Sequence, residues 1–210
     1  AELSYVMAVE ALADLEVPER AQWIRMILCE LNRLSSHFMF LGAFGVDTGV
    51  FGTPFIYAWR EREALIDLFE EVSGDRMMYA YFRPGGIAWD VPVNFVDRVR
   101  EVLISATQGI DDFDSLLSEN EIFLARTQGI GSISAERAIA LGMSGPSLRA
   151  SGVDMDIRRD EPYLKYDQVE WDVITGEHGD VFDRYYCRVM EMRESIKIIN
   201  QCLEHLAPGL

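Results

Sequence analysis

The feature that most constrains the fold is a long apolar stripe between residues 19 and 44. Its large apolar side chains recur every three or four residues, as on one face of an α-helix. They are Trp23, Ile24, Ile27, Leu28, Leu31, Leu34, Phe38 and Leu41. Pro18 suits the first turn of such a helix and disfavours helix before it. We therefore expect one helix from Glu19 to about Phe44, which either ends at Gly42–Gly45 or continues through these glycines for another turn at some cost.

Similar periodicity marks most of the remaining chain. It predicts a first helix that closes at residues 14–18, and further helices at about 53–74, 93–117, 122–126, 134–142 and 181–206. Residues 144–179 differ, because glycines and prolines interrupt extended pieces such as 168–174. There we expect a loop-rich excursion with one or two short strands. The predicted fold is mainly α, a helical bundle formed by residues 1–210 as one domain.

Composition narrows the classes of function. The 35 acidic residues outnumber the 19 basic ones, for a net charge of −16, which disfavours binding to nucleic acid or to anionic lipid. The three cysteines form no Cys-x-x-Cys pair, so we expect reduced, mostly buried thiols and no metal site of the chain's own. The chain starts without Met and already within a helical pattern, which suggests a piece of a longer protein. Helices that are apolar nearly all round suggest that other protein surrounds the bundle.

Common catalytic motifs are absent from the sequence. It contains no GxGxxG, GxxxxGK[ST], HExxH or GxSxG pattern. A di-iron bundle would need Glu three residues before a ligating histidine, and none of His37, His178 and His205 has one. We expect His37, on an apolar helix face, to be a hydrogen-bonded core residue.

Two groups of residues are candidates for a site. If the helix continues through the glycines, Met39, Ala43 and Asp47 share one face at intervals of four residues. A soft side chain, a small one and a carboxylate suit a narrow slot for a flat apolar ligand with a polar head. Alternatively, Asp47 is only the polar residue of a turn. Arg83, at the start of the Arg83–Gly86 turn, could direct its guanidinium at a neighbour's charge or form an ordinary salt bridge.

Seven separated motifs resemble a known family. They are PERAQWIRMILCELNRLSSH at 18–37, GVDTG at 45–49, TPFIYAWREREAL at 53–65, VSGDRM at 72–77, YFRPGG at 81–86, LRASGVDMDIRRDEPY at 148–163 and GDVFDRYYCRVMEMRESIKII at 179–199. Together they resemble the D subunit of respiratory complex I, the hydrogenase-like large subunit of the peripheral arm of NADH:quinone oxidoreductases. The resemblance implies a helical core similar to that of the [NiFe]-hydrogenase large subunit.

The resemblance also implies a function. The family forms the quinone-reduction chamber with an iron-sulfur small subunit that holds the terminal [4Fe-4S] cluster, and it couples electron transfer from NADH to quinone with proton translocation. Quinone is the substrate, and the chain itself binds no cofactor. Asp47 matches an aspartate that pairs with a head-group histidine, and Met39 and Ala43 match chamber-lining positions. The turn formed by Arg83, Pro84, Gly85 and Gly86 matches one that approaches the cluster.

Several departures and alternatives follow from the resemblance. The head-group tyrosine and histidine of the family precede Ala1, so we expect the 210-residue piece alone to be inactive. Many members carry histidine at the position of Met78, close to the cluster. The implied location is peripheral, on the cytoplasmic side of the membrane, with the membrane arm reached through partners. The alternatives are the large subunit of a membrane-bound [NiFe]-hydrogenase or related ferredoxin- or deazaflavin-dependent complex, and a non-catalytic helical scaffold.

Overall fold

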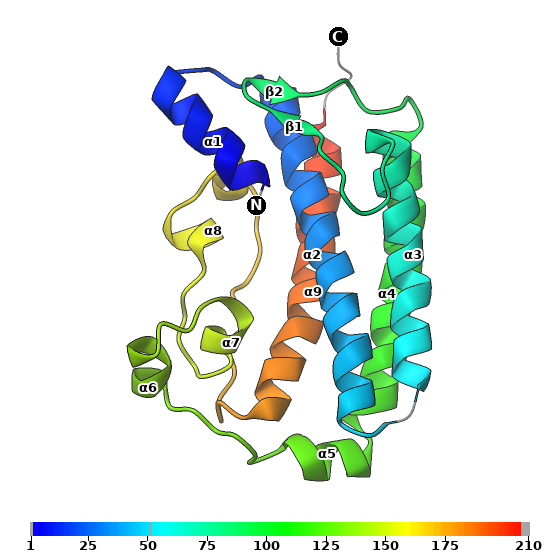
Figure 1. Ribbon diagram of the computed structural model, residues 1–210, viewed down its shortest axis with the longest axis vertical. Helices are drawn as coiled ribbons and strands as arrows, with labels where there is room; N and C mark the ends of the chain where they lie inside the picture. Colours follow the sequence, from blue (N-terminus) through cyan, green and yellow to red (C-terminus); the bar gives the residue numbers. More distant parts are fainter. Residues whose placement is uncertain (1, 51, 207–210) are drawn as a thin grey trace.

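Four long helices stand side by side in the computed structural model, which describes residues 2–50 and 52–206 (Figure 1). Helix α2 packs on α3 and α9, and α4 packs on α3 and α9, which closes the bundle. The bundle helices are α2 (Glu19–Asp47), α3 (Thr53–Ser73), α4 (Phe95–Phe113) and α9 (Val181–His205). Shorter elements surround them: α1 (Glu2–Ala13), α5 (Glu121–Thr127), α6 (Ala135–Ala140), α7 (Gly145–Arg149), α8 (Ile157–Asp160), a π-helical turn at Asp114–Ser118 and a 3-10 turn at Tyr166–Gln168. The mainly α fold class is thereby confirmed.

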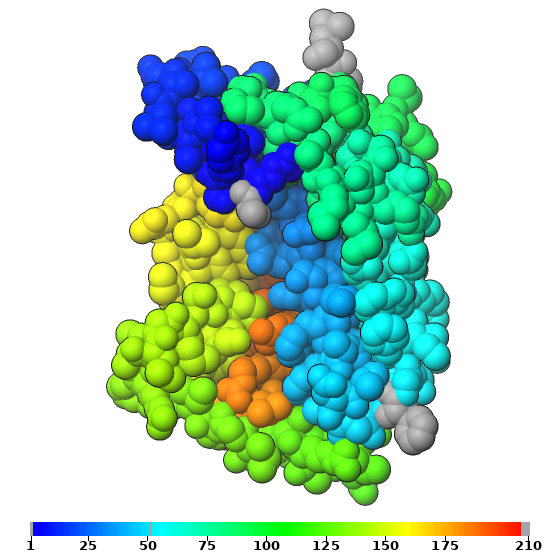
Figure 2. Space-filling view, in the orientation of Figure 1, coloured from blue at the N-terminus to red at the C-terminus, as the bar shows by residue number. Residues whose placement is uncertain are grey.

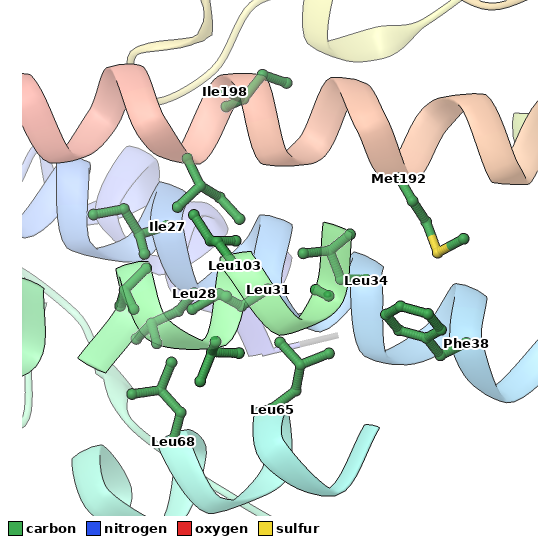
Figure 3. Close-up of a cluster of buried hydrophobic side chains, with 14 of the residues drawn as sticks. Ile27, Leu28, Leu31, Leu34, Phe38, Leu65, Leu68, Leu103, Met192 and Ile198 are labelled. Atoms are coloured by element: carbon green, nitrogen blue, oxygen red, sulfur yellow. The ribbon is translucent and has the colours of Figure 1, made fainter. Parts of the chain in front are cut away.

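The apolar stripe of α2 forms the centre of the core. All eight of its predicted core residues are buried. Figure 3 shows side chains from α2 meeting those of α3, α4 and α9, among them Leu65, Leu103 and Met192. Because removal of this surface from water drives folding, the stripe of α2 stabilises the bundle through direct packing on α3 and α9, while α4 packs on those two helices.

Helix α2 continues through its glycines and ends at Asp47. The glycines are needed for close contact with the start of α3. A Cβ atom on Gly45 would lie 2.7 Å from the Cβ of Pro54, and one on Gly42 would lie 2.9 Å from the Cβ of Ala58. Tight packing between the two helices therefore offsets the poor helix propensity of glycine. Of the two predicted outcomes, the longer helix is the one observed.

The short strands lie elsewhere than predicted. Strands β1 (Phe82–Arg83) and β2 (Gly86–Ile87) form an antiparallel hairpin next to the start of α2, with Arg83 opposite Gly86. Residues 144–179 contain α7, α8 and the 3-10 turn but no strand, so the predicted strands of this excursion are wrong.

The extended piece at 168–174 has no partner strand because side chains of α9 satisfy its backbone. The backbone N–H of Glu170 donates to Gln201 at 2.8 Å, and the backbone N–H of Asp172 donates to Glu194 at 2.9 Å. Gln201 also donates from its side chain to the carbonyl of Glu170 at 2.7 Å. An alternating pattern predicts an extended backbone but does not reveal which groups will bond to it.

Candidate functional site

The three predicted slot residues share one outward face of α2. Because the helix continues through the glycines, Met39, Ala43 and Asp47 lie one turn apart in succession, and all three are exposed. Figure 2 shows the surface of α2, in blue, uncovered in the middle of this view. The predicted alignment on a common helix face is therefore observed, and it lies on the outside of the bundle.

Asp47 is placed where a carboxylate is electrostatically disfavoured. It is the last residue of α2, at the helix end that carries the negative pole of the macrodipole, and the last turn has no basic residue. Arg126 reaches this end but donates to the carbonyl of Thr48, at 2.5 Å. The Asp47 carboxylate makes no ion pair or side-chain hydrogen bond with any residue in the described ranges. An exposed acid at this position has its oxygens available to a donor from another chain or segment.

A groove of about 290 Å³ opens beside Met39. Its walls come from α2, α3 and the segment that leads to β1, and they include Arg62, Phe69, Met77 and Tyr79. Ala43 and Asp47 lie one and two turns further along the same face, outside the lining of this groove. The structure thus brings Met39 and Met77 to one surface groove, while Asp47 lies two helical turns beyond Met39 and outside that groove.

The segment that carries Met78 is fixed at its base. One carboxylate oxygen of Asp75 accepts hydrogen bonds from the backbone N–H groups of Met77, at 2.9 Å, and of Met78, at 3.0 Å. These bonds lower the pKa of Asp75 below its usual range. The Met78 side chain itself is 84% exposed. A residue at this position is therefore presented to whatever packs against this surface.

The Arg83–Gly86 turn lies at the opposite end of α2 from Asp47 (Figure 1). The Arg83 side chain is half exposed, and its guanidinium lies 3.7 Å from the Glu2 carboxylate. The expected salt bridge is thus present, but it is loose. The turn contacts Arg25, and Asp47 lies roughly 33 Å further along the helix. The two groups of candidate residues form separate surfaces.

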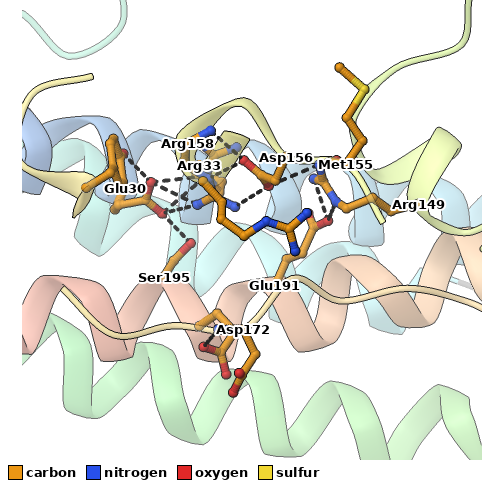
Figure 4. Close-up of polar contacts among 12 residues, drawn as sticks. Glu30, Arg33, Arg149, Met155, Asp156, Arg158, Asp172, Glu191 and Ser195 are labelled. Atoms are coloured by element: carbon orange, nitrogen blue, oxygen red, sulfur yellow. Dashed lines mark hydrogen bonds and ion pairs between the residues drawn. The ribbon is translucent and has the colours of Figure 1, made fainter. Parts of the chain in front are cut away.

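A buried polar cluster lies between α2, α9 and the 144–179 excursion (Figure 4), and of its members only His37 was expected from the sequence. Its centre is Glu30, which is fully buried. Glu30 accepts hydrogen bonds from Arg158 at 3.1 Å, Ser195 at 2.7 Å and Tyr166 at 2.5 Å, and from Arg33 at 3.2 Å. Burial alone would raise its pKa, but the two guanidinium groups and these hydrogen bonds lower the pKa of Glu30 to about 2.

The cluster continues toward the other end of α9. Arg158 also pairs with Asp156 at 2.9 Å, Asp156 with Arg149 at 3.0 Å, and Arg149 with Glu191 at 2.7 Å. Glu191 in turn lies 3.0 Å from Nε2 of His37, which confirms the expected core histidine. Burial lowers the pKa of His37 despite this carboxylate. Since its three arginines and three carboxylates balance in charge, the cluster joins the 144–179 excursion to α2 and α9 without a net buried charge.

One sequence signal could have revealed part of this cluster. Glu30 and His37 are seven residues apart within the apolar stripe, so both face the core across two helical turns. The Arg60–Glu63 charge run also contains a buried acid, which its run of charged residues does not indicate. Glu61 is 2% exposed and accepts a hydrogen bond from Ser105 at 2.5 Å. It fits because Gly109 has no side chain, and a Cβ there would lie 2.3 Å from the Glu61 Cγ.

Neither a membrane-spanning helix nor a metal-ligand group was found in the parts of the chain that the structure describes. No helix within 2–50 and 52–206 is long and apolar enough to cross a bilayer. In the same ranges, no three His, Cys, Asp or Glu side chains are grouped so that they could hold a metal ion. The fold and these surfaces define a helical-bundle protein whose candidate site lies on an outer helix face.

Comparison with known proteins identifies the family. The model of the family described as respiratory-chain NADH dehydrogenase, 49 Kd subunit, matches residues 47–210. The chain therefore belongs to this family. It is 50% identical over 207 residues to the second D subunit of the NADH-quinone oxidoreductase of Rhizobium meliloti (strain 1021), a match that covers 99% of this chain and 51% of the relative.

Other relatives agree. The D subunit of the NADH-quinone oxidoreductase of Geotalea uraniireducens (strain Rf4) is 51% identical over 99% of this chain and 53% of the relative. Its counterpart in Clostridium beijerinckii (strain ATCC 51743 / NCIMB 8052) is 47% identical over 99% of this chain and 56% of the relative. The chain thus spans about half the length of the curated relatives it matches.

Proposed function

We propose that this chain forms one wall of the quinone-reduction chamber of an NADH:quinone oxidoreductase, beside a terminal [4Fe-4S] cluster held by an iron-sulfur partner subunit. The whole enzyme would couple electron transfer from NADH to quinone with proton translocation. The observation that carries the proposal is the outward face of α2, on which Met39, Ala43 and Asp47 stand in succession. The family match favours this function over that of a [NiFe]-hydrogenase subunit or an inert scaffold.

The chemistry of this face suits a quinone. A quinone has a flat apolar ring with two carbonyl oxygens, so it needs apolar walls and few polar groups near its head. The thioether of Met39 offers a polarisable apolar surface, and the small side chain of Ala43 leaves room for the ring beside the helix. Asp47, with its exposed carboxylate oxygens, would accept a hydrogen bond from an imidazole supplied by another part of the enzyme. Such a carboxylate orients the imidazole and stabilises its charged form, which favours proton delivery.

The opposite surface suits the neighbourhood of an electron carrier. The cluster would supply one electron at a time and becomes more negative when reduced. The Arg83 guanidinium, half exposed on a tight turn, is suitable for stabilising that charge across an interface between subunits. In this arrangement the chain binds its partners at the exposed turn and α2 face, lies at the periphery of the membrane on its cytoplasmic side, and reaches the membrane arm through partner subunits.

The test is an Asp47→Asn variant in the intact enzyme. We expect NADH:quinone activity to fall at least about tenfold, because the neutral amide cannot stabilise the protonated form of the partner imidazole. NADH oxidation by ferricyanide should stay at the wild-type rate. The matched control is Asp97→Asn on α4, another exposed acid, which should change neither rate. Wild-type quinone activity in the Asp47→Asn enzyme would show that Asp47 has no part in the reaction.

A further inference from the structure

The hairpin that carries Arg83 cannot hold its own shape. Pro84 followed by Gly85, with a φ of +87° at Gly85, is the signature of a type II turn. Turns of this type do not match the twist of paired strands, and each strand here has only two residues. A hairpin of this size is unstable by itself in water. Contacts from outside the hairpin must therefore fix the position of the Arg83 backbone.

Three of those contacts come from one buried guanidinium, and Glu2 of α1 accepts a further hydrogen bond from the backbone N–H of Phe82 at 3.1 Å. Arg25 of α2 is fully buried, and its Nη2 donates to the carbonyl of Arg83 at 2.9 Å and to that of Gly86 at 2.7 Å. Its Nε also donates to the Gly86 carbonyl at 3.0 Å. The backbone of the turn is thus bound at both ends by a single planar group.

Glu10 of α1 completes the arrangement. Its carboxylate pairs with Arg25 through distances of 2.6 and 3.1 Å, and it accepts a hydrogen bond from the backbone N–H of Gly85 at 2.8 Å. The hydrogen bond from Arg25 lowers the pKa of Glu10, so the carboxylate is charged at neutral pH. Figure 2 shows α1, in dark blue, lying against the green hairpin over the start of α2.

The Arg25–Glu10 pair binds backbone polar groups of the turn, which apolar side chains could not do. A buried ion pair gives little net stability compared with well-packed apolar residues. A guanidinium, however, is a rigid fork that can bind two carbonyls and a carboxylate at once, and an ammonium group cannot reproduce that geometry. Through Arg25 of α2 and Glu10 of α1, the backbone positions of Arg83, Gly85 and Gly86 are set by two neighbouring helices, while the Arg83 side chain stays half exposed.

We infer that Glu10 and Arg25 are positioning residues for the Arg83 turn, and that they fix the direction in which its guanidinium is presented to the partner subunit. This inference rests on the proposed function, in which the turn faces the partner's terminal cluster. It assigns no contact with quinone or cluster to Glu10 or Arg25 themselves.

The test compares Arg25→Lys with Arg158→Lys in the assembled enzyme. Both variants remove a buried arginine fork, but Arg158 binds Glu30 and Asp156, away from the turn. In Arg25→Lys we expect amide hydrogen exchange at residues 82–88 to speed up at least about tenfold, since the three hydrogen bonds from the guanidinium to the carbonyls of Arg83 and Gly86 are disrupted. We also expect an altered electron paramagnetic resonance spectrum and midpoint potential of the terminal cluster. Glu10→Gln should change the exchange rate and the properties of the cluster in the same direction as Arg25→Lys. Arg158→Lys should leave the exchange rate at residues 82–88 and the cluster unchanged.

An Arg83→Met variant separates the positioning role of Glu10 and Arg25 from the proposed placement of the turn beside the cluster. If Arg83→Met alters the cluster spectrum and Arg25→Lys does not, the turn faces the cluster but needs no positioning pair, and the inference is wrong. If neither variant alters the spectrum, the proposed placement of the turn is wrong. Unchanged exchange at residues 82–88 in both Arg25→Lys and Glu10→Gln would refute the positioning role whatever the spectrum shows.

Discussion

Glu30→Gln is the substitution that most directly tests the buried polar cluster. Ser195 donates to Oε2 of Glu30 at 2.7 Å and Tyr166 to Oε1 at 2.5 Å, so the single oxygen of the amide retains only one of these two acceptor positions. The amide also loses the charge that balances Arg158, and its NH₂ group cannot accept from a guanidinium. Arg158 retains Asp156 as a partner, so the variant leaves one buried cation undercompensated rather than isolated.

Two estimates of the free energy of unfolding lost in Glu30→Gln agree. Removal of one member of a buried ion pair typically costs about 3–5 kcal/mol, and the remaining Asp156 contact favours the lower end. Independently, a pKa lowered from 4.5 to about 2 corresponds to roughly 3 kcal/mol of stabilisation of the charged form. We therefore expect Glu30→Gln to lower the free energy of unfolding by about 3 kcal/mol.

Urea denaturation followed by tryptophan fluorescence measures this loss. With a slope of about 2 kcal/mol per molar urea, the midpoint should fall by roughly 1.5 M. The matched control is Glu71→Gln, which removes the partly exposed ion pair with Arg98 and should cost about 1 kcal/mol or less. Equal, small losses in the two variants would show that the cluster does not hold the excursion on the bundle, and the argument from burial would be wrong.

Three further predictions follow from the same contacts. Because the folded pKa of Glu30 is about 2 against 4.5 for the ordinary group, its stabilisation is complete above pH 4.5 and is lost as the pH falls toward 2, which acid titration of ellipticity measures. Gly45→Ala should cost about 1–3 kcal/mol in urea denaturation, since its Cβ would lie 2.7 Å from the Pro54 ring, whereas Gly52→Ala has open space and should not. If the terminal cluster lies near Met78, Met78→His in the intact enzyme should steepen the pH dependence of the cluster potential between about pH 6 and 8. The reason is that an exposed imidazole titrates in this range. An unchanged slope would contradict the placement of the cluster near Met78.

The sequence predicted the helices well because their signals are local. The apolar stripe of α2, the proline at its start and the positive-φ glycine that ends α3 at Gly74 each act within a few residues of the chain. The same periodicity predicted that Met39 and Asp47 would share a face, once the helix was allowed to pass through its glycines. Fold class and the alignment of the slot residues were therefore accessible without coordinates.

The buried polar cluster and the hairpin support were not accessible in this way, because their partners are far apart in the chain. Glu30 meets Arg158 across 128 residues, and Arg25 meets the Gly86 carbonyl across 61. No local pattern indicates which of many arginines a carboxylate will bind. The predicted strands at 168–174 failed for the same reason, since the groups that satisfy this backbone belong to α9.

By itself, then, the sequence determined where the chain would be helical and which helix faces would be buried in the core. Both depend on residues one or two helical turns away along the chain. Only the tertiary structure decided whether each polar residue would be exposed or paired. Asp47 lies at an exposed helix end, while Glu30, on the same helix, is fully buried among cations. The difference arises because burial makes an ion pair obligatory, and the partner comes from wherever packing places it.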